Sequence, residues 1–187
     1  MKQESLSENV AEKIQQGALL VIDVQQALFQ RSTPIYNAGE LLENICALVE
    51  KARRANAPVV WVQHQNDRML AEGTDGWKLH PRLQPLTDEL HIHKQHGSAF
   101  EKTILKHELE QRGIRTLVAS GLVTQGCVKA TCLAAKALGY RIILAEDAHS
   151  NYHKQADNVI AEWHQNLSEA GIELRATSQI DFAEGIS

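Results

Sequence analysis

Cysteine is scarce in this sequence of 187 residues, and the few cysteines present exclude two common architectures. They are Cys46, Cys127 and Cys132. Because their number is odd and no two of them form a CxxC pair, the sequence favours neither a disulfide framework nor a zinc ribbon. We therefore expect the protein to work in a reducing compartment.

Long hydrophobic runs and an excess of basic charge are also missing. The longest apolar run, residues 18–22, is far too short to span a bilayer. The polar N-terminal residues contain no apolar core of a signal peptide. The formal net charge is -4 and both signs are mixed along the chain, so no basic stripe is available for a phosphate backbone. These absences predict a soluble cytoplasmic protein with no membrane or nucleic-acid partner.

The composition is that of an ordinary globular protein. Hydrophobic residues make up 43% of the chain and charged residues 22%, which is sufficient to bury one α/β core without cross-links or metals. Neither repeats nor low-complexity tracts interrupt it. We expect a single domain over residues 1–187 that begins with a polar arm over residues 1–16.

Short aliphatic segments alternate with amphipathic ones along the chain. The aliphatic segments predict strands buried on both faces, at residues 18–23, 58–64, 90–94, 114–121, 140–147 and 172–177. The amphipathic segments predict helices, at residues 38–57, 101–113, 123–139 and 154–171. This alternation predicts an α/β fold, a three-layer α/β/α sandwich around a mainly parallel, Rossmann-like sheet of about six strands.

Three chemically useful side chains fall where predicted strands end. Asp23 and Lys94 each end a strand, and Cys127 opens the helix after the fourth strand. The carboxyl ends of parallel strands share one edge of the sheet, so these three side chains are expected to converge there. Thr124 is a suitable N-cap and would make Cys127 the third helical residue, where the helix dipole and the Lys94 ammonium favour a thiolate.

Each of these residues also has an ordinary structural explanation. An aspartate after a strand often caps a turn, a lysine is usually solvated, and cysteines such as Cys46 and Cys132 usually pack in the core. Paired imidazoles, including His64 and the pair His149 and His153, leave a metal-dependent hydrolase open as an alternative. We favour ordinary surface or pocket histidines and expect no metal or other cofactor.

Four motifs, in this order and spacing, resemble the isochorismatase-like cysteine hydrolase superfamily, which includes the nicotinamidases. The motifs are LLVIDVQ, KQHGSAFEKTIL, GLVTQGCV and LAEDAHS. The resemblance covers nearly the whole chain, and it implies a catalytic triad of Asp23, Lys94 and Cys127. It also implies a cis peptide between Leu122 and Val123, with the amides of Val123 and Cys127 forming an oxyanion hole.

The resemblance extends to the substrate and to assembly. It implies a small-molecule substrate and a homo-oligomer of two or more chains. The residues that we expect to bind the substrate lie in or beside the motifs, and they are Gln25, Phe29, His64, Phe100 and Leu122.

Departures from the named activities of this superfamily narrow the prediction. Nicotinamidases carry a metal-binding Asp-x-His and a further His after the second strand, but this sequence has His64 at the Asp position, Asn66 near the first His position and Met69 instead of the further His. Isochorismatase proper lacks the nucleophilic cysteine. The segment GTDGWKLHP resembles the uncharacterised cysteine hydrolase branch instead.

The resulting prediction is a hydrolase that cleaves a carbon–nitrogen, amide-type bond of a small molecule through a thioester on Cys127. The alternatives are an isochorismatase-type hydrolase, a histidine- or metal-dependent hydrolase, and a non-catalytic ligand-binding member of the fold.

Overall fold

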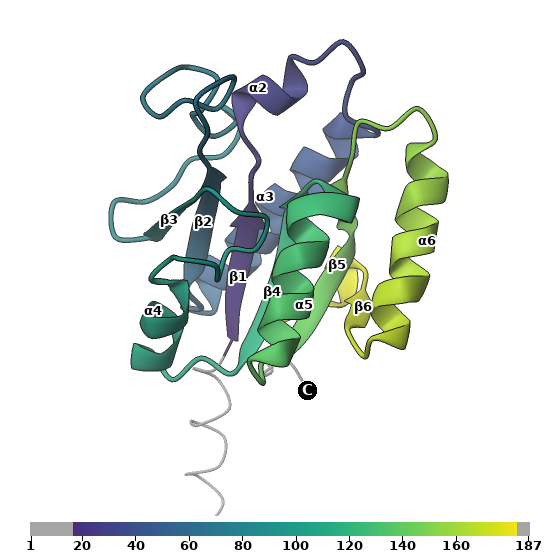
Figure 1. Cartoon of the computed structure of the whole chain (residues 1–187). Helices are drawn as coiled ribbons and strands as arrows, with labels where there is room; N and C mark the ends of the chain where they lie inside the picture. Colours follow the sequence, from purple (N-terminus) through teal and green to yellow (C-terminus); the bar gives the residue numbers. More distant parts are fainter. Residues whose placement is uncertain (1–16, 183–187) are drawn as a thin grey trace, which may run out of the picture.

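A six-stranded parallel sheet forms the centre of the molecule (Figure 1). The computed structural model describes residues 17–182, so the polar arm predicted over residues 1–16 lies outside the described part of the chain. The strands are β1 (Gly17–Ile22), β2 (Val59–His64), β3 (Leu90–Lys94), β4 (Thr116–Leu122), β5 (Arg141–Ser150) and β6 (Glu173–Arg175). Their order is β3-β2-β1-β4-β5-β6, and every neighbouring pair is parallel.

The helices lie on both faces of this sheet. They are α2 (Gln26–Phe29), α3 (Ala38–Arg54), α4 (Leu105–Gln111), α5 (Lys129–Ala137) and α6 (Ala156–Glu169), with a π-helical turn η1 (Thr124–Val128) and a 3-10 turn η2 (Thr177–Gln179). Helix α3 covers one face, while α4, α5 and α6 cover the other (Figure 1). The predicted three-layer sandwich is therefore confirmed. Within residues 17–182, no helix is both long and apolar enough to cross a membrane.

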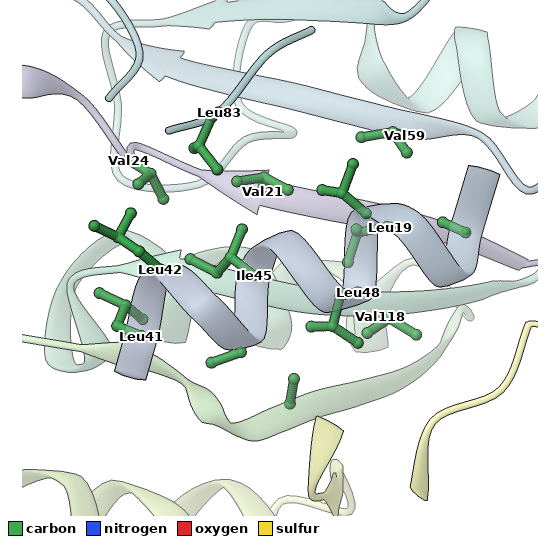
Figure 2. Close-up of a cluster of buried hydrophobic side chains, with 14 of the residues drawn as sticks. Leu19, Val21, Val24, Leu41, Leu42, Ile45, Leu48, Val59, Leu83 and Val118 are labelled. Carbon is green, nitrogen blue, oxygen red and sulfur yellow. The ribbon is translucent and has the colours of Figure 1, made fainter. Parts of the chain in front are cut away.

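Alternate residues of β1 supply the two halves of the core. Leu19 and Val21 face α3, where they pack with Leu42, Ile45 and Leu48 (Figure 2). Leu20 and Ile22 belong to the second buried cluster, on the side of α4 and α5. Burial on both faces explains why this strand is a continuous aliphatic run instead of an alternating one.

The strand order reverses beside β1. From β1 the chain builds outward through β2 to β3, then crosses back to place β4 on the other side of β1 and continues to β6. At such a reversal the loops beyond two neighbouring strands separate and leave a crevice, which is the usual ligand site in open α/β sheets. In this chain the reversal places the residues that follow β1 next to those that follow β4.

The long connection between β2 and β3, residues 65–89, folds back along the segment after β1. The amides of Gln26 and Ala27 donate to the carbonyls of Lys78 and Gly76, and the amide of His80 donates to Val24. Gly76 is required at this approach, because a Cβ atom there would lie 2.7 Å from the Met69 carbonyl oxygen. The connection is thus hydrogen-bonded to the segment that directly follows Asp23.

Candidate active site

Asp23 is held in an unusual backbone conformation directly after β1. Its φ is +52°, in the left-handed region that aspartate tolerates better than most residues. Its amide donates to the carbonyl of Val62 on β2, and its own carbonyl accepts from the amide of Gln25. The carboxylate is almost fully buried. The backbone therefore fixes Asp23 at the carboxyl end of β1, beside β2.

Lys94 reaches this carboxylate from the end of β3. Its ammonium Nζ lies 2.7 Å from Asp23 Oδ2, 3.1 Å from Cys127 Sγ and 3.2 Å from the carbonyl oxygen of His96. The side chain is completely buried. The structure thus brings together the three predicted triad residues, with the ammonium between the carboxylate and the thiol.

The thiol sits on a turn that differs from the predicted regular helix. Regular helix α5 begins only at Lys129, and Cys127 lies in the π-helical turn η1, which is interrupted by the non-helical backbone of Gly126. Thr124 does not cap a helix, since its hydroxyl lies 2.8 Å from Nδ1 of His149. The predicted N-cap, and with it the placement of Cys127 as a third helical residue, is wrong.

Burial dominates the electrostatics of the site. It raises the pKa of the Cys127 thiol to about 11, together with the negative charge of Asp23, while Lys94 opposes the shift. Burial also raises the pKa of Asp23 above its ordinary value, against the opposing effect of Lys94. The expected resting thiolate is therefore not supported, and Asp23 is a stronger base than an exposed aspartate.

One carboxylate oxygen of Asp23 is free to accept a proton. Oδ2 is engaged by Lys94, but Oδ1 is buried and has no hydrogen-bond partner within residues 17–182. A buried acceptor without a partner is rare and needs a functional or structural explanation. A proton acceptor for the neighbouring thiol, or for a water molecule, is the chemistry that this oxygen can supply.

A potential metal-ligand set overlaps the triad. Single ligand atoms of Asp23, His64 and Cys127 all lie within 4.8 Å of one another. However, the Lys94 ammonium contacts all three groups, including Nδ1 of His64 at 3.2 Å. A metal ion there would have to displace this buried cation or bind beside it against its charge. The donor set therefore fits the lysine better than a metal.

His64 supports Lys94 from the neighbouring strand. The two residues are register partners in β2 and β3. Burial and the adjacent ammonium lower the pKa of His64, so its ring is neutral near pH 7 and Nδ1 can accept from Lys94. The structure therefore places His64 beside the triad.

Two of the residues predicted to bind substrate are structural instead. The side-chain amide of Gln25 is fully buried; Nε2 donates to the carbonyls of His64 and Trp77, and Oε1 accepts from the amide of His64. Gln25 thus clamps the connection after β2 onto the segment after β1. The side chain of Leu122 is fully buried in the core on the α3 side. Neither side chain is available to a substrate.

The two predicted aromatic residues pack against other rings. Phe29 lies against His80, with ring centroids 4.5 Å apart, and Phe100 stacks on Tyr140 at 5.7 Å. Tyr140 directly precedes β5, at the edge of the sheet opposite to Cys127. Both rings are partly buried: Phe100 packs against the core on the side of α4 and α5, and Phe29 packs on the α3 side. Their contact with a substrate stays a prediction.

The backbone proposed for the oxyanion hole begins the π-helical turn. The peptide bond between Leu122 and Val123 is cis, at the position implied by the resemblance. The Val123 carbonyl accepts from the amide of Gly126 at 2.9 Å and so closes the turn. Sequence patterns gave no signal for one further residue here: Gly121 has φ +113°, and a Cβ atom there would lie 2.1 Å from the Ile22 carbonyl oxygen.

Comparison with known proteins places the chain in a family. The isochorismatase domain model matches residues 17–169. An uncharacterized isochorismatase family protein of Bacillus subtilis is 31% identical over 148 residues, which cover 76% of this chain and 82% of that protein. A streptothricin hydrolase of Streptomyces noursei is 34% identical over 137 residues, 72% of this chain but only 50% of that protein. The chain thus spans about half the length of that relative.

A solved structure shows the same architecture. The N-carbamoylsarcosine amidase from Thermoplasma acidophilum superposes with a TM-score of 0.78 at 26% identity, covering 88% of this chain and 98% of that one. The domain match, the relatives and the shared fold agree with the motifs around Asp23, Lys94 and Cys127. This chain belongs to the isochorismatase family.

Proposed function

We propose that this protein is a cysteine hydrolase that cleaves the carbon–nitrogen bond of a small amide through a thioester on Cys127. The observation that carries the proposal is the buried contact of Lys94 with both Asp23 and Cys127, beside the unpartnered Oδ1 of Asp23. Relatives named streptothricin hydrolase and N-carbamoylsarcosine amidase support the amide-type substrate. The family supports hydrolysis as the reaction class.

In acylation the thiol proton passes through Asp23 to the leaving nitrogen, and a carbon–sulfur bond replaces the carbon–nitrogen bond. Asp23 accepts the thiol proton as the sulfur of Cys127 attacks the carbonyl carbon, and the resulting oxyanion accepts hydrogen bonds from the amides of Val123 and Cys127. The tetrahedral intermediate then collapses, and the carbon–nitrogen bond breaks. The leaving nitrogen takes the proton from Asp23, so an amine or ammonia departs and a thioester remains.

Deacylation repeats these steps with water. Asp23 accepts a proton from water, whose oxygen attacks the thioester carbon, and the carbon–sulfur bond breaks as the proton returns to Cys127. The Lys94 ammonium stabilises negative charge in both reactions. Before attack the charge is on the Asp23 carboxylate, and during attack it is on the sulfur of Cys127. The raised pKa of Asp23 makes it a stronger base than an exposed aspartate, while the raised pKa of Cys127 keeps the thiol protonated until attack.

A panel of small amides, carbamates and lactams tests the proposal. Wild-type protein is expected to hydrolyse at least one member, and Cys127→Ala is expected to reduce turnover by about 1,000-fold or more while the fold is retained. Cys46→Ala is the matched control, since it removes another half-buried thiol from the opposite face of the sheet. Turnover that survives Cys127→Ala would refute the proposal.

Chelation separates this mechanism from the metal-dependent alternative built on His64. Treatment with EDTA is expected to leave the hydrolysis rate unchanged, because the proposed steps use only side chains and backbone amides. Loss of activity with EDTA, restored by zinc, would instead support a metallohydrolase.

A further inference from the structure

A buried chain of hydrogen bonds leads from the turn that carries Cys127 to helix α6. Thr124 Oγ1 lies 2.8 Å from Nδ1 of His149 on β5, and Nε2 of His149 lies 2.9 Å from Nε2 of His164 on α6. Thr124 is completely buried and His149 is 3% exposed. The two imidazole rings meet edge to face, with centroids 5.0 Å apart. None of these three side chains belongs to the triad.

Two arrangements of protons satisfy this chain when both rings are neutral. In one, Thr124 donates its hydroxyl proton to Nδ1 of His149, and Nε2 of His149 donates to Nε2 of His164; in the other, both bonds run in the opposite direction. Thr124 is bonded to His149 in either arrangement. Burial lowers the pKa of both histidines, that of His149 to about 3, and so keeps the rings neutral near pH 7.

The turn needs such an anchor because its own backbone is irregular. Gly126 has a non-helical conformation between Thr124 and Cys127, so η1 is not continuous with a regular helix. His149 itself is firmly placed, since it is the register partner of Gly121, which in turn pairs with Ile22 beside Asp23. A bond from His149 to Thr124 therefore ties the turn to the same sheet edge that positions Asp23.

We infer that His149 and His164 are positioning residues that hold Thr124, and through it the thiol of Cys127, in reach of Asp23 and Lys94. The inference rests on the proposed function of Cys127 but assigns a new role to residues outside the triad. It also replaces the pairing of His149 with His153 considered from the sequence. His153 uses Nδ1 to accept from the backbone amide of Gln155, at 3.2 Å.

The two amide substitutions of His149 provide a matched test. In Asn, the side-chain amide takes the place of Nδ1 and keeps a hydrogen-bond partner for Thr124; in Gln, the amide reaches the place of Nε2 and leaves Thr124 without one. Thr177→Val is the control for Thr124→Val, because Thr177 is also buried and donates its hydroxyl to a side chain, Asp147 Oδ1 at 2.7 Å, outside this chain of bonds.

The readout is the rate at which iodoacetamide alkylates Cys127, followed by peptide mass spectrometry with Cys46 as internal reference. Thr124→Val and His149→Gln are each expected to speed alkylation of Cys127 about 10-fold, because a thiol displaced from its buried place beside Asp23 loses the two causes that raise its pKa. His149→Asn is expected to stay within about threefold of wild type. The double variant Thr124→Val/His149→Gln should be no faster than either single variant, since both remove the same bond.

Several results would overturn the inference. They are wild-type or slower alkylation in Thr124→Val and His149→Gln, an equal acceleration in Thr177→Val, or additive effects in the double variant. A second measurement does not depend on catalysis: the ¹⁵N spectrum of His149 should show one protonated and one unprotonated ring nitrogen near pH 7. A doubly protonated ring, or one proton averaged over both nitrogens, contradicts the chain. Failure of the proposed function would appear separately, as wild-type turnover that survives Cys127→Ala.

Discussion

At the scale of single residues, the site depends on a buried ion pair. The side chains of Asp23 and Lys94 are almost completely removed from water and lie 2.7 Å apart. A buried charge is tolerated only when it is paired and hydrogen-bonded. Each partner is therefore needed to keep the other stable in the interior, and the proposed mechanism uses both.

Asp23→Asn keeps the shape of the side chain but leaves the Lys94 ammonium unpaired. We expect the free energy of unfolding in urea to fall by about 3–5 kcal/mol and turnover to be lost. Asp75→Asn is the matched control, because Asp75 pairs with Lys78 at the same 2.7 Å but on the surface. That change is expected to cost less than about 1 kcal/mol. Equal destabilisation by the two substitutions would show that burial of the Asp23 pair has no energetic consequence.

The high pKa of Cys127 predicts an unusual pH dependence of its reactivity. Only the thiolate reacts with iodoacetamide, and the Cys127 thiol has a pKa of about 11. The alkylation rate of Cys127 should therefore still be rising with pH at about pH 10. A rate that reaches its plateau below about pH 8 would show instead the activated thiolate expected from sequence.

At the scale of elements, the reversal of the sheet beside β1 requires close contact between strands. Gly121 on β4 lies against Ile22 on β1, and a Cβ atom there would lie 2.1 Å from the Ile22 carbonyl oxygen. The backbone, not the tip of a flexible side chain, occupies that space. Any side chain at this position would push apart the two strands that carry Asp23 and the turn of Cys127.

Gly121→Ala is accordingly expected to destabilise the fold by about 3 kcal/mol or more. Gly113→Ala is the matched control. Gly113 also has positive φ, at +65°, but a Cβ atom there would meet no heavy atom within 4 Å. The free energy of unfolding of that variant should fall by only about 1–2 kcal/mol, because the positive φ is the only cost there. Urea unfolding measures both, and similar losses would refute the claim of a close approach between strands.

The strands and long helices could be predicted because their sequence periodicity reports burial. The strands predicted at residues 18–23 and 90–94 correspond to β1 and β3, so Asp23 and Lys94 lie at the carboxyl ends of strands as expected. The predicted helix at 38–57 matches α3. The turn η1 was missed because its form depends on the backbone of Gly126 and on a bond from Thr124 to His149, which is 25 residues away. The structural roles of Gln25 and Leu122 were missed for a related reason, since proximity to a motif does not reveal which way a side chain points.

At the scale of the whole molecule, the stability should depend on pH through buried histidine. The pKa of His149 is lowered by burial from its ordinary value of 6.5 to about 3. Below pH 6.5 the unfolded chain binds a proton at this ring that the folded protein does not bind. The free energy of unfolding should therefore fall as the pH is lowered from 6.5 towards 3, by about 1.4 kcal/mol for each pH unit from this group.

Urea titrations at several pH values test this dependence. His149→Asn should show a smaller loss of stability than wild type between about pH 6.5 and pH 3, since asparagine does not titrate there. His107→Asn, which replaces an exposed imidazole on α4, should keep the wild-type slope. Parallel curves for wild type and His149→Asn would contradict the assignment of a buried neutral imidazole.

The proposed hydrolysis requires a covalent bond between the acyl group of the substrate and Cys127. Rapid quenching of wild-type protein with an amide that it hydrolyses, followed by intact-mass and peptide mass spectrometry, should reveal a species heavier by the acyl group and map it to Cys127. Cys127→Ala should show no adduct, and Cys46 should remain unmodified. Steady hydrolysis without any acyl-enzyme on Cys127 under single-turnover conditions, or an adduct on another residue, would contradict the proposed mechanism.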